Sequence, residues 1–363
     1  MKLKNKSLII LLSLALIGCA NQNSNKADQS NNEVKQEESK EEEEKVEQKE
    51  TADTTEDQKE ETTDQEAKHY DVNLAMLAGP TSAGAINMVE ESKNGEGTFS
   101  FNESVDGAPD AVIPKIVSGE VDSAIIPPNL AAALYNKTQG KIKVLAINNL
   151  GVLYIVESPD MNINSLDDLV KSGETLYASA KGATPDIAIH EILKANGYGE
   201  DDLKIEFLSE ASEVAQKMIA KEAKVALLPE PMVTKVLMKL EGSKVAIDIN
   251  DLYEKATGSP LISAVLLARS EYLENIDADK FLETYKASIE KANSDVEGTA
   301  KLLGKYEIIP EEVAKNALPK LALKYIAGEE MKTMMEKHLK DLYDFNPKLV
   351  GGSLPEDDFY YTK

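Results

Sequence analysis

The chain of 363 residues has no tryptophan, a single cysteine and only three histidines. One cysteine, Cys19, excludes disulfides within the chain and metal sites built from several thiolates. His69, His190 and His338 lie far apart in the sequence and fit neither a His-x-x-x-His spacing nor an EF-hand. We therefore expect a domain that is stable without cross-links and that holds no metal and no cofactor.

Arginine is nearly absent, since Arg269 is the only one, and the formal net charge is −24. Phosphate backbones are bound by clustered Lys and Arg, so nucleic acid is not an expected partner. Arginine also clamps oxyanions through its planar fork. A lone Arg269 just after an apolar segment instead indicates a structural ion pair, although backbone N–H groups can still bind an anion.

Enzyme signatures are missing as well. The chain has no Gly-x-Ser-x-Gly, no P-loop and no dinucleotide-binding glycine motif after a strand. Carboxylate pairs are too numerous to single out one of them. A glycosidase therefore stays an alternative without support, and we expect no enzymatic activity.

The N-terminus is built like an export signal. Three lysines lie within the first six residues, an apolar run covers residues 8–17, and Leu16-Ile17-Gly18-Cys19 follows. The run is too short to span a bilayer. The Leu-x-Gly-Cys ending resembles the lipobox of bacterial lipoproteins, which implies cleavage after residue 18, a lipid on Cys19 and anchoring to the cell membrane on its outer side. The alternative is an ordinary secretory signal in which Cys19 is incidental.

Residues 19–68 follow as a polar, acidic segment. It contains no aromatic residue and almost no apolar one, and its acidic residues outnumber the basic ones. Such a composition buries too little apolar surface to offset the entropy of ordering. We predict a disordered acidic tether, with a helical rod as the competing interpretation.

The remaining 69–363 are more than one core usually holds, which favours two lobes. An internal repeat supports this, because residues 116–127 match 218–229 and residues 74–81 match 177–184, each pair roughly 100 residues apart. Chance similarity between short α/β units is the alternative. Strands and helices alternate throughout, which predicts parallel sheets in two similarly built α/β lobes.

Helix starts follow many of these strands, and Asn129, Ser165 and Thr184 are placed to be N-caps. In open parallel sheets, ligands bind outside the carboxyl ends of the strands, where helix N-termini also point. If the lobes face each other, four loops at these ends converge on one cleft. The four loops cover residues 79–84, 127–129, 181–186 and 229–231.

The order of these features carries a family resemblance. The lipobox, the acidic tether, two α/β lobes, Ser165-Leu166-Asp167-Asp168-Leu169 and Leu228-Pro229-Glu230-Pro231 resemble the substrate-binding lipoproteins of ABC importers. The most similar group is the nitrate/sulfonate/taurine and thiamine-precursor binding proteins, with a type II periplasmic-binding-protein fold. The resemblance implies a monomer that delivers a small-molecule ligand to an ABC permease and its ATPase.

The resemblance also implies the division of the chain. One lobe would hold 69–156 plus 260–363, and the other 157–259. Residues 146–155 and 258–265 would be the hinge crossing segments, and their apolar, β-rich character suits central strands.

There are eight candidate ligand-binding residues. Seven lie in the four loops, and the eighth, Ser259, lies in the second crossing segment: Thr81, Ser82, Pro128, Asn129, Lys181, Thr184, Glu230 and Ser259. The hydroxyls of Thr81 and Ser82 suit a polar ligand group but are equally suited to capping. Lys181, the only cation in the four loops, can pair with an anion or be solvated. Glu230 is the strongest candidate, because a carboxylate in an apolar loop is costly to bury without a partner; its alternative role is to cap its own helix.

The ligand follows from Glu230 and the shortage of arginine. We expect a small organic compound with a cationic or heteroaromatic part, such as a thiamine-type pyrimidine. The runner-up is an alkanesulfonate, nitrate or another small anion. Tyr154, like several other tyrosines, can stack on a planar ligand but is more often a core or hinge residue. A membrane-anchored sensor or scaffold with the same fold is the alternative of a different class.

Overall fold

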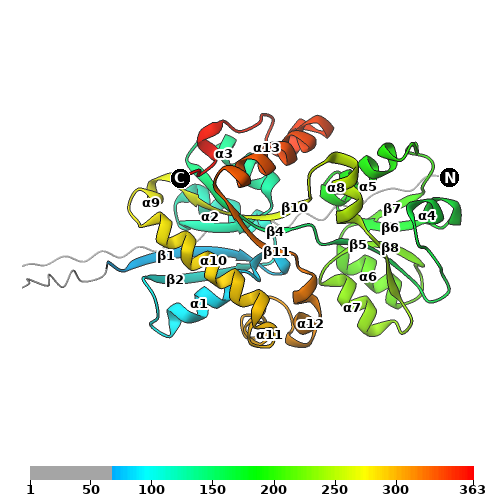
Figure 1. Cartoon of the computed structure of the whole chain (residues 1–363), viewed down its shortest axis with the longest axis horizontal. Coiled ribbons are helices and arrows are strands. Elements are labelled where there is room, and N and C mark those ends of the chain that lie inside the picture. The colour runs from blue at the N-terminus through cyan, green and yellow to red at the C-terminus, as the bar shows by residue number, and fades with distance from the viewer. Residues whose placement is uncertain (1–67) are drawn as a thin grey trace, which may run out of the picture. The chain divides into compact units, whose positions relative to one another are not determined.

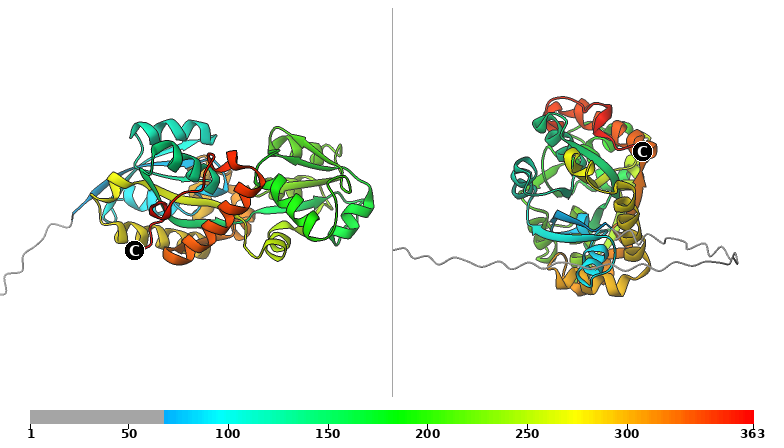
Figure 2. Two further views of the ribbon diagram at one scale, coloured as in Figure 1. Left: turned by 90° about the horizontal axis from the view of Figure 1, so that it is seen from above. Right: turned by 90° about the vertical axis from the view of Figure 1, so that its left-hand side faces the viewer.

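The computed structural model describes residues 68–363 (Figure 1). The predicted signal peptide, Cys19 and nearly all of the predicted tether lie outside the described residues. Within them, strands and helices alternate and build two separate sheets, each with helices on both faces (Figure 2). The predicted α/β class with two sheet-based lobes is confirmed.

The first sheet has six strands in the order β11-β4-β10-β3-β1-β2. Its strands are β1 (Tyr70–Leu77), β2 (Phe99–Asp106), β3 (Ser123–Ile126), β4 (Ile142–Leu150), β10 (Ile262–Arg269) and β11 (Leu323–Ala327). The second sheet has five strands in the order β7-β6-β8-β5-β9. They are β5 (Leu153–Glu157), β6 (Leu176–Ser179), β7 (Ile205–Leu208), β8 (Val225–Pro229) and β9 (Lys244–Asp248).

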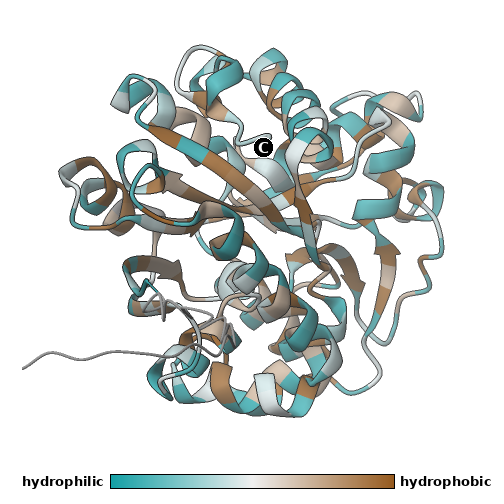
Figure 3. Ribbon diagram, turned by 60° about the vertical axis from the view of Figure 1, so that its left-hand side comes forward, coloured by the Kyte–Doolittle hydropathy of each residue, from teal (hydrophilic) through white to brown (hydrophobic). Residues whose placement is uncertain are grey.

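Each sheet is covered on both faces, so its central strands are mostly apolar while the outward faces of the helices are polar (Figure 3). The helices on the first sheet are α1 (Ile86–Lys93), α10 (Ala278–Ser294), α11 (Val296–Lys305) and α12 (Glu311–Ala317) on one face, and α2 (Pro109–Ser118), α3 (Pro128–Thr138) and α13 (Gly328–Phe345) on the other. Those on the second sheet are α4 (Leu166–Ser172), α5 (Thr184–Ala195) and α8 (Ile249–Thr257), opposite α6 (Ala211–Ile219) and α7 (Met232–Lys239). The short α9 (Ser270–Leu273) follows β10.

Strand register supports the predicted internal repeat and shifts one of its two matches by one residue, because the strand residue equivalent to Leu74 is Leu176 and not Tyr177. In the first sheet β1 pairs with β3 in parallel, with Leu74 opposite Ser123. In the second sheet β6 pairs with β8 in parallel, with Leu176 opposite Val225. The two repeats therefore place equivalent strands side by side in the same register.

The prediction of parallel sheets is only partly right. Strands β1, β2 and β3 run parallel to one another, as do β6, β7 and β8. Strands β10, β11 and β5 are antiparallel to their neighbours. Strands β5 and β10 each enter their sheet from the other lobe, at the carboxyl edge, and so must run in the opposite direction.

The link between the sheets is short. Only Gly151 and Val152 separate the end of β4 from the start of β5, and residues 258–261 separate α8 from β10. Strands β1, β3 and β4 end at the edge where the first crossing leaves, and Leu153 lies opposite Pro229 at the end of β8. The carboxyl edges of the two sheets therefore face each other across the crossings, and the four predicted loops lie on these edges.

Gly151 leaves no room for a side chain at the first crossing. A Cβ there would lie 1.9 Å from Asn250 Oδ1 and 2.9 Å from Leu261 Cβ. The Asn250 side chain holds the crossing, because its Oδ1 accepts from Leu153 N and its Nδ2 donates to Leu153 O, both at 3.2 Å. Any residue larger than glycine must displace this clamp.

Gly151→Ala is therefore expected to lower the free energy of unfolding by about 1–2 kcal/mol, the cost of overpacking plus the lost clamp. Chemical denaturation measures this. The matched control is Gly107→Ala, where a Cβ meets no atom within 4 Å, and it should leave stability nearly unchanged. Equal effects of both substitutions would contradict a tight crossing.

Candidate functional site

The loop after β1 contains the first two candidates. Gly79, with φ of 122°, leads into a short 3-10 turn, Pro80–Ser82. The buried Ser82 Oγ donates to Leu77 O at 2.7 Å and accepts from Leu77 N at 3.0 Å. Ser82 thus closes the loop on the end of β1, while the buried hydroxyl of Thr81 has no hydrogen-bond partner among residues 68–363.

Two adjacent asparagines of β4 form hydrogen bonds to this loop. Ile147 and Asn149 lie opposite the consecutive residues Val265 and Ala264 of β10, so Asn148 is an extra residue in a β-bulge. Asn148 Nδ2 donates to Thr81 O at 2.7 Å, and Asn149 Nδ2 contacts Pro80 O at 3.3 Å. Neighbouring side chains of a regular strand point to opposite faces; the bulge instead lets both amides reach one loop.

Sequence reasoning did not single out this pair. Its signal is two polar amides inside the apolar run Ala146-Ile147-Asn148-Asn149-Leu150. Both side chains are 0% exposed in the structure. Buried polar groups in a strand need hydrogen-bond partners, so two amides within an apolar run could have indicated a polar site at this position.

Glu230 lies on the facing edge, in the loop between β8 and α7. Its Oε2 accepts from Thr234 N and its Oε1 accepts from Thr234 Oγ1, both at 3.0 Å. The side chain is buried, and burial raises the pKa of its carboxyl despite these two hydrogen bonds. The capping role weighed for Glu230 is present, but two hydrogen bonds leave acceptor capacity on both oxygens.

Residues 318–321 connect the two edges. Lys320 Nζ lies 3.9 Å from Glu230 Oε1, and Lys320 O accepts from Tyr154 Oη at 3.4 Å. Next to it, Leu321 O lies 3.4 Å from Asn149 Nδ2. Burial, followed by nearby carboxylates, raises the pKa of Tyr154 to about 12, so its hydroxyl stays protonated. We call Thr81, Asn148, Asn149, Tyr154, Glu230 and Lys320 the inter-sheet site.

Pro128 and Asn129 lie in the first turn of α3, whose N-cap is Pro127, so the prediction that Asn129 caps this helix is wrong. Proline at the first helical position needs no partner for an N–H group, so the helix begins at Pro128, before Asn129. Thr184 is likewise the first residue of α5 rather than its cap. Asp186, in the first turn of α5, closes the preceding loop onto the helix, because its Oδ2 accepts from Gly182 N at 2.7 Å.

The other predicted residues have local roles. The cap at Ser165 is confirmed, since Ser165 Oγ accepts from Asp168 N at 3.1 Å. Lys181 is exposed, with its Nζ 5.8 Å from the ring centre of Phe207. The backbone of buried Ser259 bonds to Thr257 Oγ1. The structure therefore joins Thr81 and Glu230 in one contact chain. Within residues 68–363, no hydrogen bond or ion pair links that chain to the other five candidates, Pro128, Asn129, Lys181, Thr184 and Ser259.

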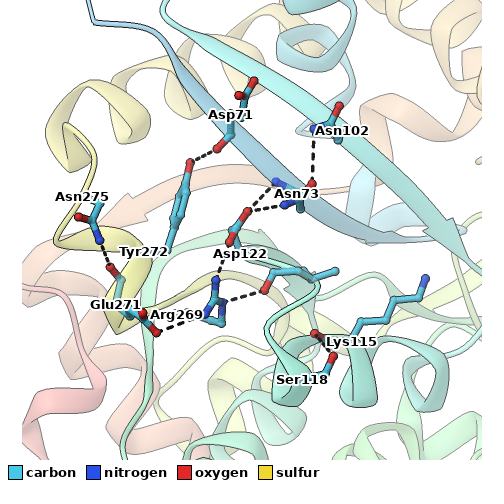
Figure 4. Close-up of polar contacts among 11 residues, drawn as sticks. Asp71, Asn73, Asn102, Lys115, Ser118, Asp122, Arg269, Glu271, Tyr272 and Asn275 are labelled. Carbon is cyan, nitrogen blue, oxygen red and sulfur yellow. Dashed lines mark hydrogen bonds and ion pairs between the residues drawn. The ribbon is translucent and has the colours of Figure 1, made fainter. Parts of the chain in front are cut away.

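Arg269 forms the structural ion pair that its position predicts (Figure 4). Its Nη2 lies 2.7 Å from Asp122 Oδ1 and its Nε donates to Val121 O at 3.1 Å. Asp122 Oδ2 also accepts from the backbone and side-chain nitrogens of Asn73. The single guanidinium thus ties β10 to β3 and β1 and is not free to clamp an oxyanion.

A groove of about 620 Å³ lies between α5 and α13, lined among others by His190, Glu191, Asp341 and Phe345. It contains none of the predicted ligand-binding residues. No three His, Cys, Asp or Glu side chains gather as potential metal ligands within residues 68–363. None of the helices in the same part of the chain combines the length and apolar content that crossing a membrane requires.

No protein-family model and no curated protein sequence matches the chain. Solved structures do match it. An ABC transporter protein from Parabacteroides distasonis is 22% identical with a TM-score of 0.69, over 82% of this chain and 99% of its own. The periplasmic aliphatic sulphonate binding protein of Escherichia coli is 15% identical with a TM-score of 0.62, over 80% and 92%.

A third structural neighbour is the periplasmic nitrate-binding protein of Synechocystis, 14% identical with a TM-score of 0.54, over 76% of this chain and 81% of its own. At these identities the likeness shows the fold alone. The predicted type II periplasmic-binding-protein fold, with two sheets joined by hinge crossings, is confirmed.

Proposed function

We propose that this protein, whose fold is that of the type II periplasmic binding proteins, is the extracytoplasmic solute-binding component of an ABC importer. The observation that carries the proposal is the inter-sheet site, in which side chains of both sheets contact two adjacent residues, Lys320 and Leu321, beside two short crossings. A ligand that contacts both edges favours the closed arrangement to the extent that it binds that form better. The permease and its ATPase then recognise the closed form.

The ligand we propose is a small organic compound with a cationic or heteroaromatic part, such as a thiamine-type pyrimidine. Glu230 supplies a buried carboxylate whose desolvation a ligand cation would offset. Tyr154, half-buried beside it, offers an aromatic face. The alternative is an alkanesulfonate or nitrate, which is favoured by what the Escherichia coli and Synechocystis neighbours bind. Against it stands the ion pair of Arg269 with Asp122, which occupies the only arginine of the chain.

The N-terminal part of the sequence would anchor this protein to a membrane. Cleavage after residue 18 would leave Cys19 as a lipid-modified N-terminus. The lipid would anchor a monomeric binding domain to the outer side of the cell membrane through the acidic tether. Mass spectrometry of the processed protein tests this, and an unmodified cysteine would contradict it.

A thermal-shift screen of the full-length chain tests the binding function. The probes are thiamine, 4-aminopyrimidine, methanesulfonate and nitrate, because a ligand that binds only the folded state raises the melting temperature. We expect a saturable shift with one class of probe and recovery of that probe unchanged. Conversion of the probe would indicate an enzyme, and the absence of any shift would contradict a binding protein for these ligands.

A further inference from the structure

Three buried oxygen atoms of the inter-sheet site lack a hydrogen-bond partner within the described part of the chain: Thr81 Oγ1, Asn148 Oδ1 and Asn149 Oδ1. They belong to residues in direct contact, since Asn148 Nδ2 donates to the Thr81 carbonyl. A buried acceptor without a partner costs about as much as a lost hydrogen bond, and native structures contain few of them. Three on contacting residues at one sheet edge require an explanation.

The hydrogen-bond pattern fixes which way both amides point. Asn148 Nδ2 donates to Thr81 O and to Tyr285 Oη, both at 2.7 Å. Asn149 Nδ2 lies between the carbonyls of Pro80 and Leu321. A carbonyl oxygen can only accept, so an amide nitrogen must face it in each case. The free atoms are therefore the two amide oxygens, which can only accept, together with a hydroxyl that can accept as well.

Local architecture brings the side chains that carry these atoms to one loop. The bulge at Asn148 brings two successive side chains to the loop of Pro80 and Thr81, and bulges are over-represented next to binding sites for this reason. The neighbouring Ser82 shows the contrast, because its hydroxyl is satisfied within the loop. Loop closure thus uses the Ser82 hydroxyl and, within residues 68–363, leaves Thr81 Oγ1 without a hydrogen bond.

We infer that Thr81 Oγ1, Asn148 Oδ1 and Asn149 Oδ1 form an acceptor subsite that takes the N–H donors of the ligand, an inference that rests on the proposed binding function. The chemical class is a primary amine, an amidine or the amino group of an aminopyrimidine, each of which carries several donors on adjacent atoms. A sulfonate or nitrate has no hydrogen to donate, so its oxygens would face the amide oxygens, acceptor against acceptor, without a hydrogen bond. Because the three atoms are buried, the ligand reaches them when the two edges separate about the crossings.

Thr81→Val is the direct test, since valine keeps the shape of threonine and removes only the unpartnered hydroxyl. We expect the affinity of the full-length chain for 4-aminopyrimidine to fall about 5- to 10-fold, the effect of losing one buried hydrogen bond. Thr81→Ser should restore most of it. Unsubstituted pyrimidine, which lacks the amino group, should bind weakly to all three proteins.

Thermal stability separates this role from a structural one. The melting temperature of ligand-free Thr81→Val should equal or exceed that of the wild type, because no bond in the fold is lost. Ser82→Ala, which removes two hydrogen bonds from the same loop, should lower it. A destabilised Thr81→Val with unchanged affinity for 4-aminopyrimidine would mean that a buried water satisfies these atoms, and would overturn the subsite.

The outcomes also separate the subsite from the proposed function. Binding of methanesulfonate or nitrate without binding of 4-aminopyrimidine would overturn the acceptor subsite and leave a solute-binding protein. Equal affinity for pyrimidine and 4-aminopyrimidine would do the same. If no probe of either class binds, the binding function fails and the subsite with it. A crystal structure with 4-aminopyrimidine should place its amino nitrogen within hydrogen-bond distance of an Asn148 or Asn149 oxygen.

Discussion

Glu230→Gln is expected to weaken the binding of thiamine by about 10- to 100-fold, which corresponds to the loss of one charge-assisted interaction in a buried site. Methanesulfonate and nitrate should bind the variant as well as the wild type or slightly better. The reason is that the substitution keeps the shape of the side chain but offers a cation no charge. Isothermal titration calorimetry with each probe measures the effect.

Stability should not account for this loss. Burial raises the pKa of Glu230, so the folded state holds its proton to a higher pH than the unfolded chain does. Ionisation therefore opposes folding as the pH rises above the unfolded value of about 4.3. Glu230→Gln removes that cost and should melt no earlier than the wild type at pH 7, with the difference shrinking towards acid pH.

Glu157 provides a matched control, because it is a second buried carboxylate on the second sheet. Its Oε2 accepts from Ile163 N at 2.6 Å and its Oε1 lies 3.0 Å from Lys244 Nζ. Glu157→Gln should change stability and leave thiamine affinity unaltered. If Glu230→Gln weakens the anions and spares thiamine, the ligand assignment is wrong.

Acid is expected to destabilise the protein through His338, by roughly 3 kcal/mol between pH 7 and pH 4. The side chain is 1% exposed in α13, and neither ring nitrogen has a hydrogen-bond partner in the described chain. Burial, aided by the nearby charge of Lys337, lowers the pKa of His338 to about 4. The unfolded chain takes up this proton near pH 6.5, so acid favours unfolding until the pH falls below about 4.

His338→Leu should remove this part of the pH dependence and be at least as stable as the wild type at pH 7. The measurement is chemical denaturation of both proteins at pH 7, 6 and 5, before most carboxylates titrate. His69→Gln, at an exposed position, controls for the loss of a histidine and should follow the wild-type curve. A wild-type slope retained by His338→Leu would place the acid sensitivity elsewhere.

Much of the fold was predictable because it rests on local signals. The repeat of 116–127 in 218–229 reflects two strand-helix units whose pattern of buried strand, glycine and proline is set by backbone sterics. Strand direction was not predictable for β5 and β10. Their polarity depends on which sheet the chain has just left, and no residue of either strand encodes that information.

The site was predictable at the level of loops and less so at the level of residues. Glu230 and Thr81 stand out in their loops as polar groups beside apolar strands, and the structure places both in the inter-sheet site. The other members are harder to find in the sequence. Asn148 and Asn149 belong to a bulge of β4, and Lys320 belongs to residues 318–321. Both positions depend on tertiary pairing. Side chains such as Ser82 and Thr184 look alike in sequence, because a hydroxyl that closes a loop and one that meets a ligand differ only in their neighbours.

The common register of the two repeats has a consequence for how specificity can change. Each repeat contributes one of the two carboxyl edges at the inter-sheet site, so neither half of the molecule holds a complete site. Residues of one edge can therefore be substituted while the contacts of the other edge are kept. Under the proposed function, adaptation to a new solute can then proceed one loop at a time, while the two sheets keep their geometry. Under the proposed function, a protein built in this way can change its solute while keeping its architecture.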